Sequence, residues 1–252
     1  MGYDKTAVRK ILDAAKAAGR SALTAPETQG LCEAYGIAVP KEGVASTAAD
    51  AAKLAAQIGF PVVMKIVSPQ ILHKTEAGGV MVGVRSAEAA QDAFATIVAN
   101  ARRHDPNATI EGVQVQQMLS GGQEVLIGAV TDPAFGKLVA FGLGGILVEV
   151  LKDITFRLAP ATREDALSML DGIAAAEILR GVRGAPSVDR EALATMIVNV
   201  SQLVTDFPEV SELDLNPVFA TPRGATAADV RVVLDFKPPV ARYRPSQEVI
   251  VR

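Results

Sequence analysis

The stretch GFPVVMKIVSPQILHKTEAGGV, residues 59–80, contains the strongest structural signals in the chain. Its apolar run at residues 60–67 predicts a buried strand, and a loop at residues 68–80 leads into a second strand at residues 80–84. Lys65 lies inside the apolar run, where an unpaired ammonium group would be costly. The sequence therefore predicts that Lys65 binds an anion or has a carboxylate partner.

Four residues of the loop suit phosphate chemistry: His73, Lys74, Gly78 and Gly79. Glycines allow backbone amides to approach an anion closely, and a lysine adds a positive charge. A neutral imidazole is a good nucleophile toward phosphorus, so His73 is a candidate phosphate carrier. Each feature also has an ordinary interpretation, because paired glycines are typical of a hairpin turn and a lone loop histidine is commonly a surface residue.

A second group of polar residues lies toward the C-terminus. Asp214 and Asn216 alternate along an expected strand at residues 213–219 and therefore share one face, and Asp235 lies on a further strand at residues 230–236. Hard oxygen ligands of this kind suit Mg²⁺ that is held partly by nucleotide phosphates. Surface acids on an edge strand are an equally good interpretation of the spacing alone.

A third element is the glycine cluster of FGLGGILVEVLKD, residues 141–153. Residues 142–145, which include Gly144 and Gly145, permit a tight loop over a ligand. The cluster is neither a Walker A motif nor a Rossmann fingerprint, because the lysine-serine ending and the final glycine are missing.

Helix and strand signals are mixed along the chain rather than strictly alternating, which indicates an α+β protein. Residues 119–122 are either a connector between two lobes or a hairpin loop. We divide the chain into an N-terminal helix (1–22), a small lobe with the phosphate loop (23–112) and a large lobe with the metal site (113–252). Besides the strands already named, we expect helices near residues 4–18, 24–36, 47–58, 86–103, 163–180 and 189–206, and strands near 112–118, 124–130, 137–141 and 147–150.

Composition narrows the class of protein. With 252 residues, 49% apolar residues and a formal net charge of −3, the chain is expected to be a soluble globular protein with a substantial core. Basic residues form no cationic stripe, so nucleic acid is not an expected partner. Cys32 is the single cysteine, and neither a signal peptide nor a long apolar run is visible, so we expect a cytoplasmic protein with no membrane association.

In this order, the motifs resemble the ATP-grasp subunit of the ADP-forming acyl-CoA synthetases, which are relatives of succinyl-CoA synthetase. The likeness covers nearly the whole chain and includes LTAPETQGLCEAYGIAVP (23–40), the 59–80 stretch, FGLGGILVEVLKDITFRLAP (141–160) and ELDLNPV (212–218). It implies an ATP-grasp fold, in which two α+β lobes enclose a nucleotide cleft.

The resemblance also implies roles for individual residues. Lys65 would contact the phosphates of ATP or ADP, and Glu124 would be the active-site glutamate near the transferred phosphate. His73 would be the phosphorylatable loop histidine, which succinyl-CoA synthetase itself lacks. The adenine would be bordered by the segment that includes Gln116, Met118 and Leu119, and Mg²⁺ would be held by Asn216 and Asp235 with Asp214 beside them.

The implied reaction is acyl-CoA + ADP + phosphate ⇌ carboxylic acid + CoA + ATP. An acyl phosphate would form at a partner's site, a partner histidine would take the phosphoryl group, and His73 would deliver it to Mg-ADP. The chain shows no glycine-rich CoA-binding unit, so a CoA-binding α subunit with the second phosphohistidine is expected, in a heterotetramer. The alternatives are an ATP-grasp carboxylate ligase that makes an acyl phosphate directly, and a non-catalytic nucleotide-binding regulatory module.

Overall fold

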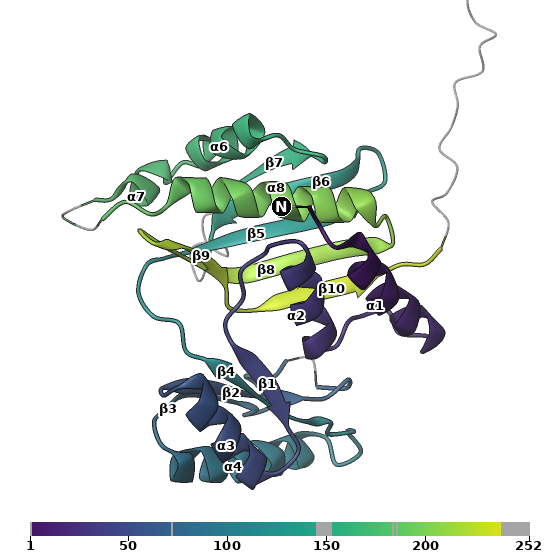
Figure 1. The fold of residues 1–252 in the computed structure, drawn as a ribbon, viewed down its shortest axis with the longest axis vertical. Coiled ribbons are helices and arrows are strands. Elements are labelled where there is room, and N and C mark those ends of the chain that lie inside the picture. The colour runs from purple at the N-terminus through teal and green to yellow at the C-terminus, as the bar shows by residue number, and fades with distance from the viewer. Residues whose placement is uncertain (1, 72, 145–152, 183, 185, 238–252) are drawn as a thin grey trace, which may run out of the picture.

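The computed structural model describes residues 2–71, 73–144, 153–182, 184 and 186–237. These residues form two lobes, each an antiparallel sheet with helices packed on one face (Figure 1). The predicted α+β class is therefore confirmed, and the two lobes are joined by segments of the chain that run between them (Figure 1).

The small lobe contains a four-stranded sheet in the order β1-β4-β2-β3. Alternate residues of β2, such as Met64 and Ile66, are fully buried against the two helices, and so Lys65 between them points to the opposite face. Thr47 and Ser86 cap the two helices by accepting hydrogen bonds from backbone amides. The elements are β1 (Glu42–Ala45), α3 (Ala48–Ile58), β2 (Val62–Val67), β3 (Val80–Val84), α4 (Ala87–His104) and β4 (Gly112–Gln117).

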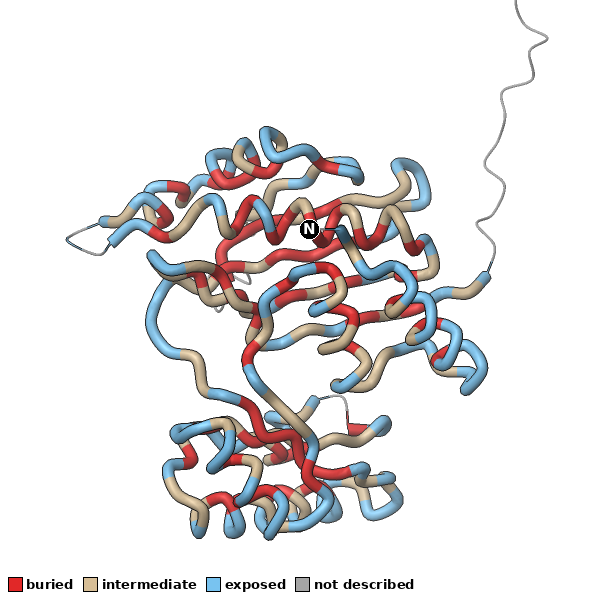
Figure 2. The backbone as a smooth tube through the Cα atoms, in the orientation of Figure 1, coloured by how far each residue is buried: buried red, intermediate tan, exposed pale blue. Residues whose placement is uncertain are grey.

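The large lobe is built on a six-stranded sheet in the order β10-β8-β5-β6-β7, with β9 paired to β8. Helix α8 has more buried residues than any other helix in the described ranges, and Figure 2 shows buried residues along α8 and the central strands. The elements are α1 (Lys5–Ala17), α2 (Ala25–Ala34), β5 (Gln123–Asp132), β6 (Gly136–Leu143), β7 (Ile154–Leu158), α6 (Arg163–Gly172), α7 (Ala176–Arg180), α8 (Arg190–Asp206), β8 (Val210–Thr221), β9 (Gly224–Ala227) and β10 (Val230–Leu234).

Helices α1 and α2 pack in the large lobe, whereas the sequence analysis placed the second of them in the small lobe. Leu31 and Tyr35 lie in the same buried cluster as α8, and the Tyr35 hydroxyl donates a hydrogen bond to Asp206 at 2.7 Å. The small lobe thus spans residues 42–117 rather than 23–112. The periodicity of an amphipathic helix indicates that it has an apolar face but does not indicate which lobe that face covers.

The segment after β4 connects the lobes, which decides between the two interpretations of residues 119–122. Strands β4 and β5 lie in different sheets, so they cannot form a hairpin. Gly122 has φ +85°, and a Cβ there would lie 2.3 Å from the Ala220 carbonyl oxygen, so the connector needs glycine at this point. The strand predicted at residues 147–150 lies outside the described residues.

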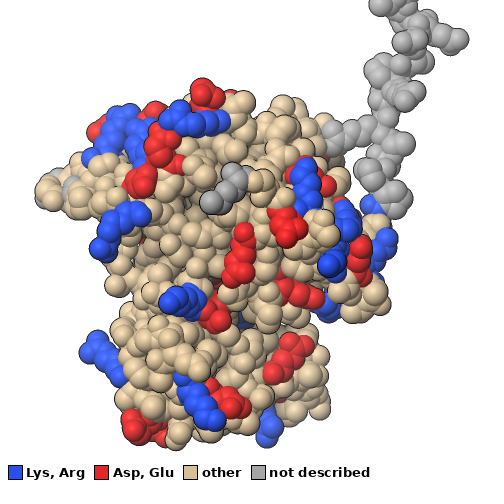
Figure 3. Space-filling view, viewed as in Figure 1, with Lys and Arg blue, Asp and Glu red and all other residues tan. Residues whose placement is uncertain are grey.

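Charged side chains of both signs are interspersed on the face of the molecule that Figure 3 shows. No extended stripe of one sign is visible on that face. Across the described ranges, no helix combines the length and the apolar character that a membrane span requires.

Candidate functional site

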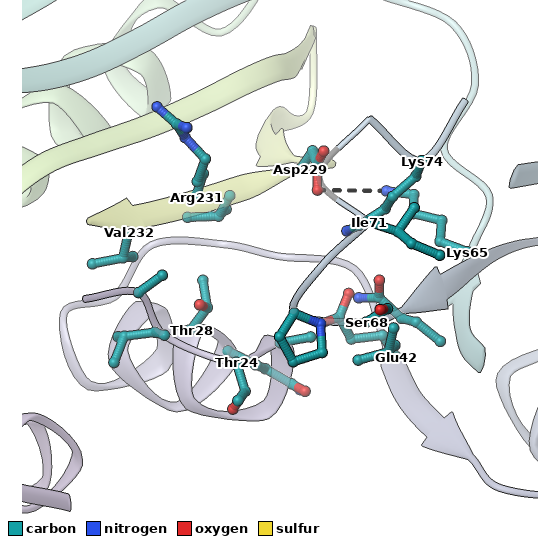
Figure 4. Close-up of a pocket in the computed structure, with 18 of the residues that line it drawn as sticks. Thr24, Thr28, Glu42, Lys65, Ser68, Ile71, Lys74, Asp229, Arg231 and Val232 are labelled. Carbon is teal, nitrogen blue, oxygen red and sulfur yellow. Dashed lines mark ion pairs between the residues drawn. The ribbon is translucent and has the colours of Figure 1, made fainter. Parts of the chain in front are cut away.

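A cavity of about 940 Å³ lies between the lobes. Its walls are one face of the small sheet, the loop after β2, the edge strand β10 and the segment that precedes α2 (Figure 4). That segment forms a β-bridge with β10 between Ala22 and Val233. The polar residues on these walls include Glu42, Lys65, His73, Lys74, Gln116 and Asp229.

Lys65 has the anionic partner that the sequence predicts, and the partner comes from the other lobe. Its Nζ lies 3.6 Å from Asp229 Oδ1 and 3.4 Å from the Ala228 carbonyl oxygen (Figure 4). The Lys65 side chain is 13% exposed, whereas that of Asp229 is 57% exposed. An ion pair with one exposed partner contributes only about 0–1 kcal/mol, so an incoming ligand can displace it at little cost.

Asp229 lies beside the predicted metal residues. The backbone amide of Asn216 donates a hydrogen bond to the Asp229 carbonyl at 3.1 Å, and Asp214 precedes Asn216 on the same strand. Burial raises the pKa of the Asp214 carboxyl, and the charges of Asp229 and Glu212 raise it further, against the opposing effect of Arg231. A carboxylate whose ionised form is disfavoured by burial and by neighbouring negative charge suits the binding of a divalent cation.

Asp235 does not lie beside Asn216, so the structure does not bring these two predicted metal residues together. Val230 pairs with Leu215 in the antiparallel ladder, and the following residues of β10 run away from Asn216. Asp235 is exposed, and its amide donates to the Glu209 carbonyl at 2.8 Å. The register of β8 with β10 places Asp229 beside Asn216 instead.

In the described ranges, no three His, Cys, Asp or Glu side chains form a ready-made metal site. This arrangement fits Mg²⁺ better than a structural metal, because Mg²⁺ is commonly held by one or two protein carboxylates together with substrate phosphates and water.

The loop brings His73 and Lys74 to the cavity, and its glycines form a turn. The amides of Gly78 and Gly79 donate to the carbonyls of Thr75 and Lys74 at 3.0 and 2.8 Å. Both amides are therefore engaged within the turn in this conformation, and a role for them in nucleotide binding stays a prediction. The turn explains both glycines, since Gly78 has φ +62° and a Cβ on Gly79 would lie 2.5 Å from Ile66 Cγ2.

Glu42 is a cavity residue that the sequence analysis missed. It lies opposite Gln116 in the β1–β4 ladder, and Gln116 Nε2 donates to Glu42 Oε2 at 2.6 Å. Burial raises the pKa of the Glu42 carboxyl, against the opposing hydrogen bonds of Gln116 and Gln114 and the charge of Lys65. The sequence offered one signal for this wall of the cavity: polar residues alternate at positions 114 and 116 in the strand that pairs with the strand of Glu42.

The remaining predicted residues lie around the connector and strand β5. The Met118 amide donates to the Pro61 carbonyl at 3.3 Å, and Met118 and Leu119 are both half-buried. Glu124 lies on β5, away from the described cavity walls, and its carbonyl accepts a hydrogen bond from the Gly144 amide at 2.8 Å. The Gly144 amide is thus engaged, Gly145 lies outside the described residues, and a role for Glu124 near a transferred phosphate stays a prediction.

Two facing α+β lobes with a lysine and carboxylates between them define the ATP-grasp class. A family model described as an ATP-grasp domain matches residues 14–234. The beta subunit of ADP-forming acetate–CoA ligase I from Pyrococcus furiosus is 49% identical over 226 residues, which cover 90% of this chain and 97% of the relative. The chain belongs to the ATP-grasp family and, within it, to the group of ADP-forming acid–CoA ligases.

Further relatives agree with this assignment. The 4-hydroxybutyrate–CoA ligase (ADP-forming) of Nitrosopumilus maritimus is 45% identical over 233 residues, and this chain spans 33% of that longer protein. A solved structure of acetyl-coenzyme A synthetase 1 from Ca. Korarchaeum cryptofilum, in complex with coenzyme A and Ca-AMPCP, has a TM-score of 0.88 and 41% identity over 90% of this chain and 99% of that chain. Another structure of the same protein, with TM-score 0.81, 38% identity and coverage of 90% and 100%, contains Mg-AMPPCP and a phosphohistidine segment pointing towards the nucleotide-binding site.

Proposed function

We propose that this chain is the nucleotide-binding subunit of an ADP-forming acid–CoA ligase and transfers a phosphoryl group reversibly between phosphohistidine and Mg-ADP. The complete reaction is acyl-CoA + ADP + phosphate ⇌ carboxylic acid + CoA + ATP. One observation carries the proposal: His73 lines the same cavity as Lys65 and Asp229, on a loop between two strands. The phosphohistidine segment of the K. cryptofilum protein supports a carrier role for this histidine.

In the direction of ATP formation, a terminal oxygen of ADP attacks the phosphorus on His73. The N–P bond breaks as the new O–P bond forms, and the bonding electron pair returns to the ring nitrogen. A proton on the other ring nitrogen leaves the released imidazole neutral. Lys65 exchanges its contact with Asp229 for the phosphate oxygens, where its charge offsets the negative charge of the transferred group. Lys74 lies on the same loop and adds a second positive charge to the cavity wall.

The register of β8 with β9 and β10 supports the choice of metal residues. Asn216, Asp214 and Asp229 would hold Mg²⁺, which when bound neutralises charge on the nucleotide phosphates. The Mg-AMPPCP of the related structure supports this choice of ion. Gln116, Met118 and Leu119 would border the adenine, because they lead from the cavity wall into the connector between the lobes.

A CoA-binding α subunit with its own phosphohistidine completes the reaction, in a heterotetramer. Two relatives from P. furiosus, at 49% and 45% identity, are named as beta subunits, which supports a partner of this kind. The buried free thiol of Cys32 is compatible with a reducing cytoplasm.

Labelling tests the carrier role. The chain is incubated with ATP labelled in the γ-phosphoryl group and Mg²⁺, with and without its co-encoded α subunit, and acid-labile, base-stable label is measured. We expect wild type to be labelled, His73→Asn to be unlabelled, and His104→Asn, at the end of α4, to match wild type. Label that persists in His73→Asn would refute the carrier role, and an acyl phosphate formed without any protein label would indicate a direct carboxylate ligase.

A further inference from the structure

Glu42 is an acidic side chain on the cavity wall, on a strand that β4 separates from the strand of Lys65. It projects from the edge strand β1 on the same sheet face as Gln114, Gln116 and Lys65. Lys65 on β2 is opposite Gln114 of β4, and Glu42 on β1 is opposite Gln116, two residues further along β4. Strand β4 therefore lies between the strands of Lys65 and Glu42. Glu42 therefore lies on the side of Lys65 that leads toward the connector.

The surroundings of Glu42 leave it with unused acceptor capacity. A carboxylate has about four lone-pair sites. The described side-chain donors to Glu42 are the amides of Gln116 and Gln114, and these two glutamines are only 5% and 6% exposed. A partly buried carboxylate is costly unless donors satisfy it, so the remaining sites favour a ligand with hydrogen-bond donors in the cavity.

The inference rests on the proposed function and extends it to the nucleoside. Phosphates would be repelled by Glu42, whereas a nucleoside offers neutral donors in its ribose hydroxyls and in the exocyclic amino group of adenine. We propose that Glu42 determines nucleotide specificity by accepting a hydrogen bond from a nucleoside donor. The hydrogen bond that Gln116 Nε2 donates to Glu42 also fixes the orientation of the Gln116 side-chain amide. The side-chain carbonyl oxygen of Gln116 can therefore accept a hydrogen bond from the ligand.

The test compares nucleotides by calorimetric titration of the chain in the presence of Mg²⁺. The probes are ADP, 2′-deoxy-ADP, 3′-deoxy-ADP and inosine diphosphate, in which an oxo group replaces the adenine amino group. We expect wild type to bind at least one analogue about tenfold or more weakly than ADP, because a hydrogen bond to a charged acceptor is lost. A loss with a deoxynucleotide identifies a ribose hydroxyl as the donor, and a loss with inosine diphosphate identifies the amino group.

The variant Glu42→Ala should bind ADP and that analogue with the same affinity, while Glu42→Gln should retain part of the preference. Asp92→Ala, which removes an exposed acid from α4 of the same lobe, should behave as wild type. A preference that survives unchanged in Glu42→Ala, or a wild type that binds all four nucleotides equally, would overturn the inference while leaving nucleotide binding intact. Failure of wild type to bind ADP at all would instead refute the proposed function, and the inference with it.

Discussion

The ammonium group of Lys65 and the carboxylate of Asp229 lie 3.6 Å apart across the two lobes. In the proposed reaction these two groups have separate ligands, since Lys65 contacts phosphate and Asp229 contacts Mg²⁺. Without nucleotide they neutralise each other. Ligand binding therefore replaces one inter-lobe contact with two protein–ligand contacts.

Replacing Asp229 tests the metal assignment most directly. Asp229→Asn should weaken Mg-ADP binding about tenfold or more, because substitutions even in the outer shell of a metal site commonly cost that much. The matched control is Asp235→Asn, just after β10, which should bind Mg-ADP as wild type does. The Asp235 carboxylate accepts a hydrogen bond from the Lys237 amide at 2.9 Å, and the β8–β10 register places Asp235 away from Asn216. Calorimetric titration of both variants decides between the two aspartates, and the reverse ranking would restore Asp235 as the ligand.

Asp214→Asn should stabilise the nucleotide-free protein and impair its function. Because the folded-state pKa of Asp214 is raised, ionisation of this carboxyl costs folding free energy at pH values above that pKa. The neutral amide removes this cost, and we expect the Tm to rise by roughly 2–4 °C, the effect of about 1 kcal/mol in a chain of this size. Mg-ADP affinity should fall. Glu212→Gln, an exposed neighbour paired with Arg231, should alter neither quantity substantially, and a lower Tm in Asp214→Asn would contradict the explanation.

The sequence predicted the elements of this site better than their combinations. The apolar strand around Lys65 and the helix near residues 86–103 were both confirmed, because the periodicity of apolar residues is a local property. The pairing of Asn216 with Asp229 was missed, because it depends on the antiparallel register of β8 with β9 and β10, which the spacing of acids does not reveal. The glycines of the loop were identified, and their turn conformation accounts for them.

Gly79→Ala should destabilise the loop that bears His73. The new Cβ would meet Ile66 Cγ2 at 2.5 Å and the Lys74 carbonyl oxygen at 3.0 Å, and the backbone atom cannot easily move. Overpacking of this kind typically costs about 1–3 kcal/mol. Urea unfolding measures the cost, and Gly30→Ala in helix α2, where only Ile11 Cδ1 lies close, should cost less than about 1 kcal/mol. Equal stability of the two variants would contradict the packing account.

Glu27 should make the protein more sensitive to acid. The Arg20 guanidinium and the Thr24 cap hold the pKa of Glu27 at about 2, below its ordinary value of 4.5. A depressed folded-state pKa contributes stability that is fully present above 4.5 and is lost as the pH falls toward 2. The stability difference between wild type and Glu27→Gln, measured by urea unfolding, should therefore shrink across this range. A stability difference that stays constant between pH 4.5 and 2 would contradict this account.

The chain passes between the lobes twice within the described residues, once before β1 and once after β4 (Figure 1). Both passages flank the same pair of neighbouring strands, so they restrain the small lobe at two points and favour rotation about the line that joins them. Under such a restraint, Lys65, Glu42 and Gln116 move together as parts of one sheet. Nucleoside contacts at Glu42 and Gln116 and phosphate contacts at Lys65 are thus made by one sheet, so any rotation of the small lobe would change both sets of contacts together.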